Sequence, residues 1–167
     1  SCDLSRRDSM IFVTVGTHPG GFDRLIRHMD KIAGLLKEKV IIQRGFNKYT
    51  PQNAEYFDFA DNLEPYFSKA RIVISHSATS LVEFVLTQKK PIIAVPRRAD
   101  FGEHINDHQV EFARYLEHKL GIKAVMNIHE ITSALLIGYN TLPRVDRSGM
   151  KRLQNFLKNI ISTYEPN

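Results

Sequence analysis

The chain has 167 residues, of which 43% are hydrophobic and 25% are charged, values that are average for globular proteins and allow one substantial core. The net charge of +5 suits nucleic acid, anionic lipid or phosphorylated ligands only where basic residues gather on one face. The single cysteine, Cys2, excludes a disulfide framework and a cysteine-based zinc cluster.

Targeting segments are not recognisable in this sequence. Uninterrupted apolar runs reach at most four residues, whereas a membrane span needs about 20 and a signal-peptide core about 7 to 15. We therefore predict no membrane span and no secretory signal, and the lone cysteine, which suits a reducing compartment, favours a cytoplasmic location. Residues 1–9, which are polar and of mixed charge, are interpreted as a disordered leader or a cloning remnant.

Short β-branched runs alternate with amphipathic patterns along residues 10–140. The runs that are apolar on both faces or resemble short strands are residues 10–15, 40–43, 56–59, 71–75, 91–95 and 123–126. Apolar residues three and four positions apart predict a helix from Phe22 to Leu36, and similar patterns lie at 80–87, 106–120 and 131–139. The alternation predicts an α/β fold, a Rossmann-like doubly wound parallel sheet in one domain.

A last helix is predicted after the break at residues 141–143, so that residues 141–167 form a basic amphipathic helix. Residues 143–161 contain five basic residues and a single acidic one, Asp146. In a helix, Leu153, Phe156 and Ile160 would share one side. Such a helix packs on its own domain, docks a partner or lies at an anionic membrane surface, and these three alternatives stay open.

The first candidate loop, residues 15–21, lies between a strand and a helix and contains three glycines. Gly16, Thr17 and His18 begin it, and the free amides of the following helix could face an anion. The loop matches neither a Walker sequence nor G-x-G-x-x-G. It is therefore either a phosphate cradle or a tight turn without a ligand.

The second loop follows the strand at residues 71–75 and carries small hydroxyl side chains. Ser77, Thr79 and Ser80 could leave helix amides open to a phosphate, and Glu83 could accept hydrogen bonds from a sugar diol. The alternative is that Ser77 or Thr79 caps the helix and Glu83 is an ordinary first-turn acid.

The third loop, residues 96–109, is dense in polar side chains. Arg97 and Arg98 could neutralise a diphosphate, and Asp107 and Gln109 suit sugar hydroxyls.

A metal site is the competing interpretation of this loop, because Glu103, His104, Asp107 and His108 could act as ligands. Their order is not His-Glu-x-x-His, and Gly102 disfavours a helix before His104.

Other residues carry little catalytic signal. His28, His118 and His129 lie in helical or turn patterns and are predicted to be surface histidines. A Gly-x-Ser-x-Gly elbow is missing from the sequence, and Cys2 lies in the leader, so a hydrolase nucleophile has no support.

The three loops together resemble the family 28 glycosyltransferase C-terminal domain. The resemblance spans residues 10–136. Within that family the chain is similar to the short members, which are the PssE-like exopolysaccharide subunits and the cytosolic subunit of the dolichol-linked N-acetylglucosamine transferase. It rests on Gly16-Thr17-His18 with Phe22-Asp23-Arg24-Leu25, Phe57-Asp58-Phe59 with Leu63, Ile74-Ser75-His76, Gly102-Glu103-His104 and Asp107-His108-Gln109.

The resemblance implies the donor-binding half of a GT-B glycosyltransferase, with a UDP-sugar as substrate. Residues implied at the diphosphate are Gly16, Thr17, His18, Ser77, Thr79, Ser80, Arg97 and His104. Those implied at the nucleoside are Phe59, Asn62 and Glu83, and those at the sugar are Asp107, His108 and Gln109. No cofactor or divalent metal is implied. Ser77-Ala78-Thr79 departs from the glycine-rich run common in relatives.

The functional prediction depends on the second domain that a GT-B site requires. A GT-B site needs two such domains, and the sequence predicts one, so we expect a membrane-associated partner that binds a lipid-linked sugar acceptor and supplies the catalytic base. The chain is then inactive or weakly active alone and sits peripherally at the cytoplasmic membrane face. Two alternatives stay open: a regulatory or scaffolding subunit of such a complex and, less favoured because a basic stripe with stacking aromatics is missing, a nucleic-acid-binding module.

Overall fold

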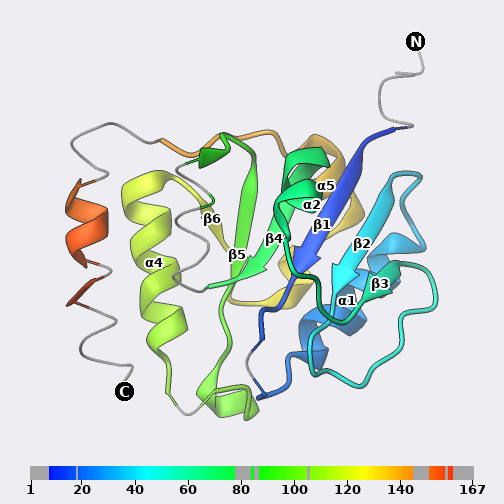
Figure 1. Cartoon of the computed structure of the whole chain (residues 1–167), viewed down its shortest axis with the longest axis horizontal. Coiled ribbons are helices and arrows are strands. Elements are labelled where there is room, and N and C mark those ends of the chain that lie inside the picture. The colour runs from blue at the N-terminus through cyan, green and yellow to red at the C-terminus, as the bar shows by residue number, and fades with distance from the viewer. Residues whose placement is uncertain are drawn as a thin grey trace.

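Six parallel strands form one sheet in the order β3-β2-β1-β4-β5-β6 (Figure 1). The computed structural model describes residues 8–17, 19–77, 84, 87–104, 106–144, 151–156 and 158–159. The strands are β1 (Met10–Thr14), β2 (Lys39–Gln43), β3 (Glu55–Phe57), β4 (Ala70–His76), β5 (Ile92–Val95) and β6 (Lys123–Ala124). Every pairing is parallel, with Ile11 opposite both Val40 and Ile72. The predicted doubly wound sheet is confirmed.

Helices connect the strands on both faces of the sheet. They are α1 (Asp23–Ala33), α2 (Glu64–Lys69), α4 (His108–Leu120) and α5 (Ser133–Gly138), with single 3-10 turns η2 (Ala99–Phe101) and η3 (Ile128–Glu130). The sequence did not predict α2, because six residues are too few to show a helical period. The predicted helix over residues 80–87 lies mostly outside the described residues.

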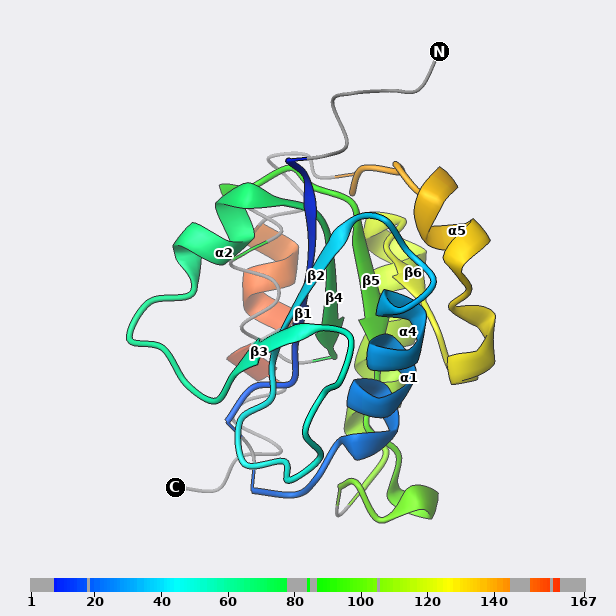
Figure 2. The ribbon, with the colours of Figure 1, turned by 90° about the vertical axis from the view of Figure 1, so that its right-hand side faces the viewer.

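Each face of the sheet buries its own apolar cluster. On one face, α1 and α5 cover Val13, Ile42 and Ile74. On the other, α2, α4 and residues 151–156 enclose Phe12 and Val73. Figure 2 shows α1 and α5 on one side of the strands and α2 on the other. Because β1 is buried on both faces, its sequence is continuously apolar, as a central parallel strand requires.

The described part of the C-terminal segment packs on its own domain. Leu153 is buried against the α4 face, and the ring of Phe156 stacks on Tyr115 with centroids 3.8 Å apart. These contacts show self-packing for residues 151–156, while docking to a partner or to a membrane stays a prediction. None of the helices described here is long and apolar enough to cross a membrane.

Charged side chains close the amino end of the sheet. Arg71, at the start of β4, binds Glu38 through two nitrogens, at 2.6 and 2.8 Å, and donates to the carbonyls of Leu136 and Tyr139 in and after α5. Lys90 donates to the Ser68 and Ala70 carbonyls. These bonds tie helix ends to strand starts, and they give Arg71, Glu38 and Lys90 partners within the protein.

Candidate functional site

The first loop leaves β1 at the opposite, carboxyl end of the sheet. Gly16 has φ +74°, and a Cβ there would lie 2.6 Å from Nε2 of His76, the last residue of β4. Only glycine fits this close approach without displacing the ring. Thr17 is exposed, and His18 lies outside the described residues.

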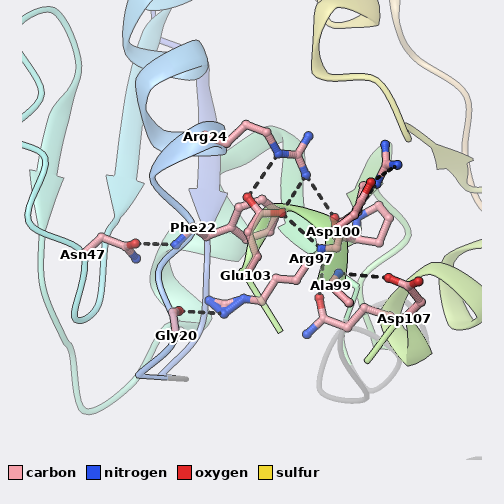
Figure 3. Close-up of polar contacts among 12 residues, drawn as sticks. Gly20, Phe22, Arg24, Asn47, Arg97, Ala99, Asp100, Glu103 and Asp107 are labelled. Carbon is pink, nitrogen blue, oxygen red and sulfur yellow. Dashed lines mark hydrogen bonds and ion pairs between the residues drawn. The ribbon is translucent and has the colours of Figure 1, made fainter. Parts of the chain in front are cut away.

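Arg97 lies beneath this loop and is completely buried. Its guanidinium donates to the carbonyls of Val15, at 2.7 Å, and Gly20, at 3.2 Å, and sits 5.1 Å from the ring centre of Phe22. Figure 3 shows the bond to Gly20. Burial lowers the pKa of Arg97 to about 10, with Glu103 acting in the opposite direction, so the group is charged at neutral pH. Arg97 holds the loop from behind rather than from an open surface.

Glu103 joins the third loop to the start of α1. Its carboxylate is buried and accepts hydrogen bonds from Nε and Nη2 of Arg24, at 3.1 and 3.0 Å, and from the amide of Arg98 (Figure 3). The carboxylate is thereby committed to cationic and amide donors. Within the described ranges, no group of three or more His, Cys, Asp or Glu side chains could hold a metal ion.

The residues predicted at the sugar help to shape the third loop. Asp107 accepts a hydrogen bond from the amide of Ala99, at 2.9 Å, and Gln109 accepts one from the amide of Arg97, at 3.0 Å. His104, which was predicted at the diphosphate, accepts one from the Asn106 amide, and His108 lies 3.6 Å from Glu111. The structure thus brings Arg97 and Gln109 together, and contact of Asp107, His108 and Gln109 with a sugar stays a prediction.

Ser77 is the described part of the second predicted loop. It is only 1% exposed, and its Oγ has no hydrogen-bond partner in the structure. An unpaired buried hydroxyl costs about 1–3 kcal/mol, which singles out this position at the carboxyl end of β4. Thr79, Ser80 and Glu83 lie outside the described residues.

The segment after β3 presents aromatic surface. Phe59 is 49% exposed, and its ring meets that of Phe46, which is 58% exposed, edge to face with centroids 4.8 Å apart. Asn62 accepts a hydrogen bond from the Glu64 amide at 2.9 Å, so its side chain shapes the start of α2. The predicted nucleoside role of this segment stays a prediction.

Sequence reasoning missed two buried amides. Gln43 ends β2 and binds both the first loop and Asp58. Asn47 accepts a hydrogen bond from the Phe22 amide (Figure 3) and donates one to the Arg44 carbonyl. A polar residue closing an apolar strand just before a glycine, as in Ile42-Gln43-Arg44-Gly45, was the available signal for Gln43.

One histidine assignment was wrong. His28 is half-buried, and its Nε2 lies 2.6 Å from the Ile131 carbonyl. Burial lowers the pKa of His28, the Ile131 bond raises it, and nearby His129 lowers it further. The helix placed His28 toward η3, which sequence spacing could not show. His118 and His129 are exposed, as predicted.

Comparison with known proteins adds to this geometry. The model of the glycosyltransferase family 28 C-terminal domain matches residues 10–164. The chain belongs to this family. Membership covers β1 through the C-terminal segment, so all three loops lie within the family 28 domain.

A curated relative is the UDP-N-acetylglucosamine transferase subunit ALG13 of Debaryomyces hansenii, 28% identical over 108 residues, which are 65% of this chain and 49% of the relative. The chain thus aligns with about half of that protein's length.

Solved structures share the fold of this family 28 domain. MurG of Acinetobacter baumannii superposes with a TM-score of 0.59 at 15% identity, over 95% of this chain and 49% of MurG. The glycosyltransferase SnogD of Streptomyces nogalater gives a TM-score of 0.58 at 13% identity, over 95% of this chain and 40% of SnogD. Both likenesses establish the fold alone, and each covers less than half of the other protein.

Proposed function

We propose that this chain is the donor-binding part of a split UDP-sugar-dependent glycosyltransferase. It would transfer a hexosyl or N-acetylhexosaminyl group to a lipid-diphosphate-linked acceptor, for polysaccharide or glycan precursor synthesis. A membrane-associated partner would hold the acceptor, and the chain would act in the cytoplasm at the membrane face. Family membership and the name of the Debaryomyces relative support the donor class.

The observation that carries the proposal is the buried cation behind the glycine loop. In open parallel sheets, ligands bind at the carboxyl ends of the strands, where loops and free helix amides converge. At this end, Arg97 lies directly behind the loop carbonyls of Val15 and Gly20, fully removed from water. A charge in a low-dielectric interior acts over a longer range than one in water, which favours an anionic diphosphate on the outer side of the loop.

The chemistry of transfer divides between two proteins. The bond between the anomeric carbon and the diphosphate oxygen breaks, and the acceptor hydroxyl oxygen bonds to that carbon. Its proton passes to a base on the partner, and UDP leaves with the bonding electron pair. This chain would stabilise the departing diphosphate through loop amides, Ser77 and the charge of Arg97. We propose no metal requirement, because the buried arginine supplies positive charge.

Calorimetric titration of the full chain at low salt tests donor binding. We expect UDP and UDP-N-acetylglucosamine to bind, and ADP to bind at least about tenfold more weakly. A chain that binds none of the three, or ADP as well as UDP, contradicts the proposal.

A transfer assay tests the division of labour. With a co-expressed membrane-anchored partner and a polyprenyl-diphosphate-linked sugar, we expect labelled sugar to appear in the lipid fraction. Transfer by this chain alone at the same rate would contradict the partner requirement. Gln109→Ala and Glu83→Ala separate a donor site from a scaffold, because a scaffolding subunit would keep full complex activity with either change.

A further inference from the structure

Gln43 stands at the junction of three strand ends. It is the last residue of β2 and only 2% exposed. Its Oε1 accepts hydrogen bonds from Thr14 Oγ1, at 2.6 Å, and from the Gly16 amide, at 3.2 Å. Its Nε2 donates to the carbonyls of Gly16, at 3.1 Å, and Asp58, at 3.0 Å. Both donors and both acceptor positions of the amide are therefore used.

These contacts fix the orientation of the amide. The Gly16 N–H can only donate, and the Gly16 and Asp58 carbonyls can only accept. One arrangement of the side-chain oxygen and nitrogen satisfies all three groups, and a flipped amide would lose every bond to them. Gln43 is thus held as firmly as the backbone groups that it joins.

The backbones around Gln43 approach each other unusually closely. Gly45 has φ +60°, and a Cβ there would lie 2.6 Å from the Gly16 carbonyl oxygen. The Gly45 amide donates to the same Asp58 carbonyl that receives Gln43, at 3.0 Å. The loops after β1, β2 and β3 therefore meet at one buried amide, with two positive-φ glycines making room for it.

The two segments that Gln43 joins are those assigned to different parts of the donor. The Gly16 loop is proposed to face the diphosphate, and the segment after Asp58 to face the nucleobase, so the argument rests on the proposed function. These segments cover the Gln43 side chain, so it would touch neither the diphosphate nor the nucleobase. It can act on the ligand only through the spacing of the two subsites.

We propose that Gln43 is a positioning residue that sets the distance between the diphosphate loop at Gly16 and the nucleoside segment at Asp58–Phe59, so that the site selects an intact nucleoside diphosphate over its separate parts. A ligand that spans two rigidly spaced subsites gains affinity because its second part binds as an intramolecular event. That gain vanishes when the spacing fluctuates, even if each subsite remains intact.

Binding of UDP is compared with binding of its two parts, uridine and inorganic pyrophosphate, each titrated into the full chain by NMR. Gln43→Met removes the four hydrogen bonds at similar volume, and Gln43→Glu keeps the shape but turns an oxygen toward two carbonyls. In both variants we expect UDP affinity to fall about tenfold or more and affinity for each part to change less than about twofold.

Two controls isolate linkage from stability. Thr14→Val removes one bond to Gln43 but leaves its bonds to Gly16 and Asp58, and it should keep UDP affinity within about twofold. Arg71→Met destabilises the opposite end of the sheet and should also leave UDP affinity unchanged.

The outcomes separate the two proposals. If UDP affinity in the Gln43 variants falls no more than in Arg71→Met, or if the parts weaken as much as UDP does, the positioning role is wrong while the donor site stands. If the unaltered chain binds neither UDP nor its parts, the donor site itself is wrong, and the positioning role fails with it.

Discussion

The two ends of the same parallel sheet solve the burial of polar groups in opposite ways. At the amino end, Arg71, Glu38 and Lys90 pair with one another or with helix and strand carbonyls. At the carboxyl end, the buried side-chain atoms that have no hydrogen-bond partner in the described part of the chain include Asp23 Oδ1, Ser77 Oγ and Arg97 Nε. Folding alone favours the first arrangement. The second arrangement lowers stability at the end where a ligand is proposed to bind. Substitutions at the two ends should therefore separate effects on stability from effects on binding.

Breaking the amino-end ion pair should have the largest effect on stability. Arg71→Met leaves the Glu38 carboxylate, which is only 8% exposed, without its cation, and removing one partner of a buried pair costs about 3 kcal/mol. Chemical denaturation measures the loss. The exposed pair of Lys39 and Glu55 at the same end is the control, because Lys39→Met should cost under about 1 kcal/mol. Equal losses would show that Arg71 behaves as a surface group.

Gly16→Ala should have the largest effect on binding. The left-handed backbone costs a non-glycine residue roughly 1–2 kcal/mol, and the new Cβ would also collide with His76. We expect UDP affinity to fall at least about tenfold by calorimetry. Gly121 has a similar φ of +65° but meets only the flexible Arg144 side chain, so Gly121→Ala should lose stability and keep UDP affinity. A Gly16→Ala chain that binds UDP normally would remove this loop from the site.

Ser77→Ala should sharpen the contrast because its two effects have opposite signs. Removing an unpaired buried hydroxyl should leave the free energy of unfolding unchanged or raise it by up to about 1 kcal/mol, while UDP affinity falls about threefold to tenfold. Ser75 is equally buried but donates to the His76 carbonyl at 2.9 Å. Ser75→Ala should therefore lower stability and spare binding. The reverse pattern would assign the unpaired hydroxyl to packing.

The smallest expected effect is the pH dependence from His28. Burial lowers its folded-state pKa, so the unfolded chain takes up a proton first as the pH falls. The contribution of His28 to stability is therefore present above pH of about 6.5 and is lost as the pH falls below it. Thermal unfolding at pH 7.5 and 5 should show a smaller acid loss in His28→Gln than in the unaltered chain. An identical loss would mean that His28 does not contribute.

The strands and the loops were predictable to different degrees. Runs such as Ile11-Phe12-Val13 predict a buried parallel strand, because continuous apolarity suits a position covered on both faces. The loop at Gly16 was also predictable, because three glycines in seven residues indicate a backbone conformation that other residues rarely adopt. The helix α2 was missed because its six residues, Glu64–Lys69, follow no period that exceeds chance.

Side-chain roles at the site were harder to predict than their location. Arg97 was expected near a diphosphate, and its position beneath the loop depends on Val15, Gly20 and Phe22, which lie 75 to 82 residues away in the chain. Gln43 gave almost no signal, because its partners Gly16 and Asp58 reach it only when three strands lie side by side.

The sequence by itself determined the sheet, the alternation of helices and the three loops that leave the strand ends, because hydrophobic period and glycine placement are local properties of the chain. Only the tertiary structure decided which polar groups are paired. Hydrogen bonds and burial depend on residues far apart in sequence, and the free energy of a buried charge or amide depends on every neighbour that the fold places around it. For that reason the burial of Arg97, the four hydrogen bonds of Gln43 and the unpaired hydroxyl of Ser77 could be found only in the tertiary structure.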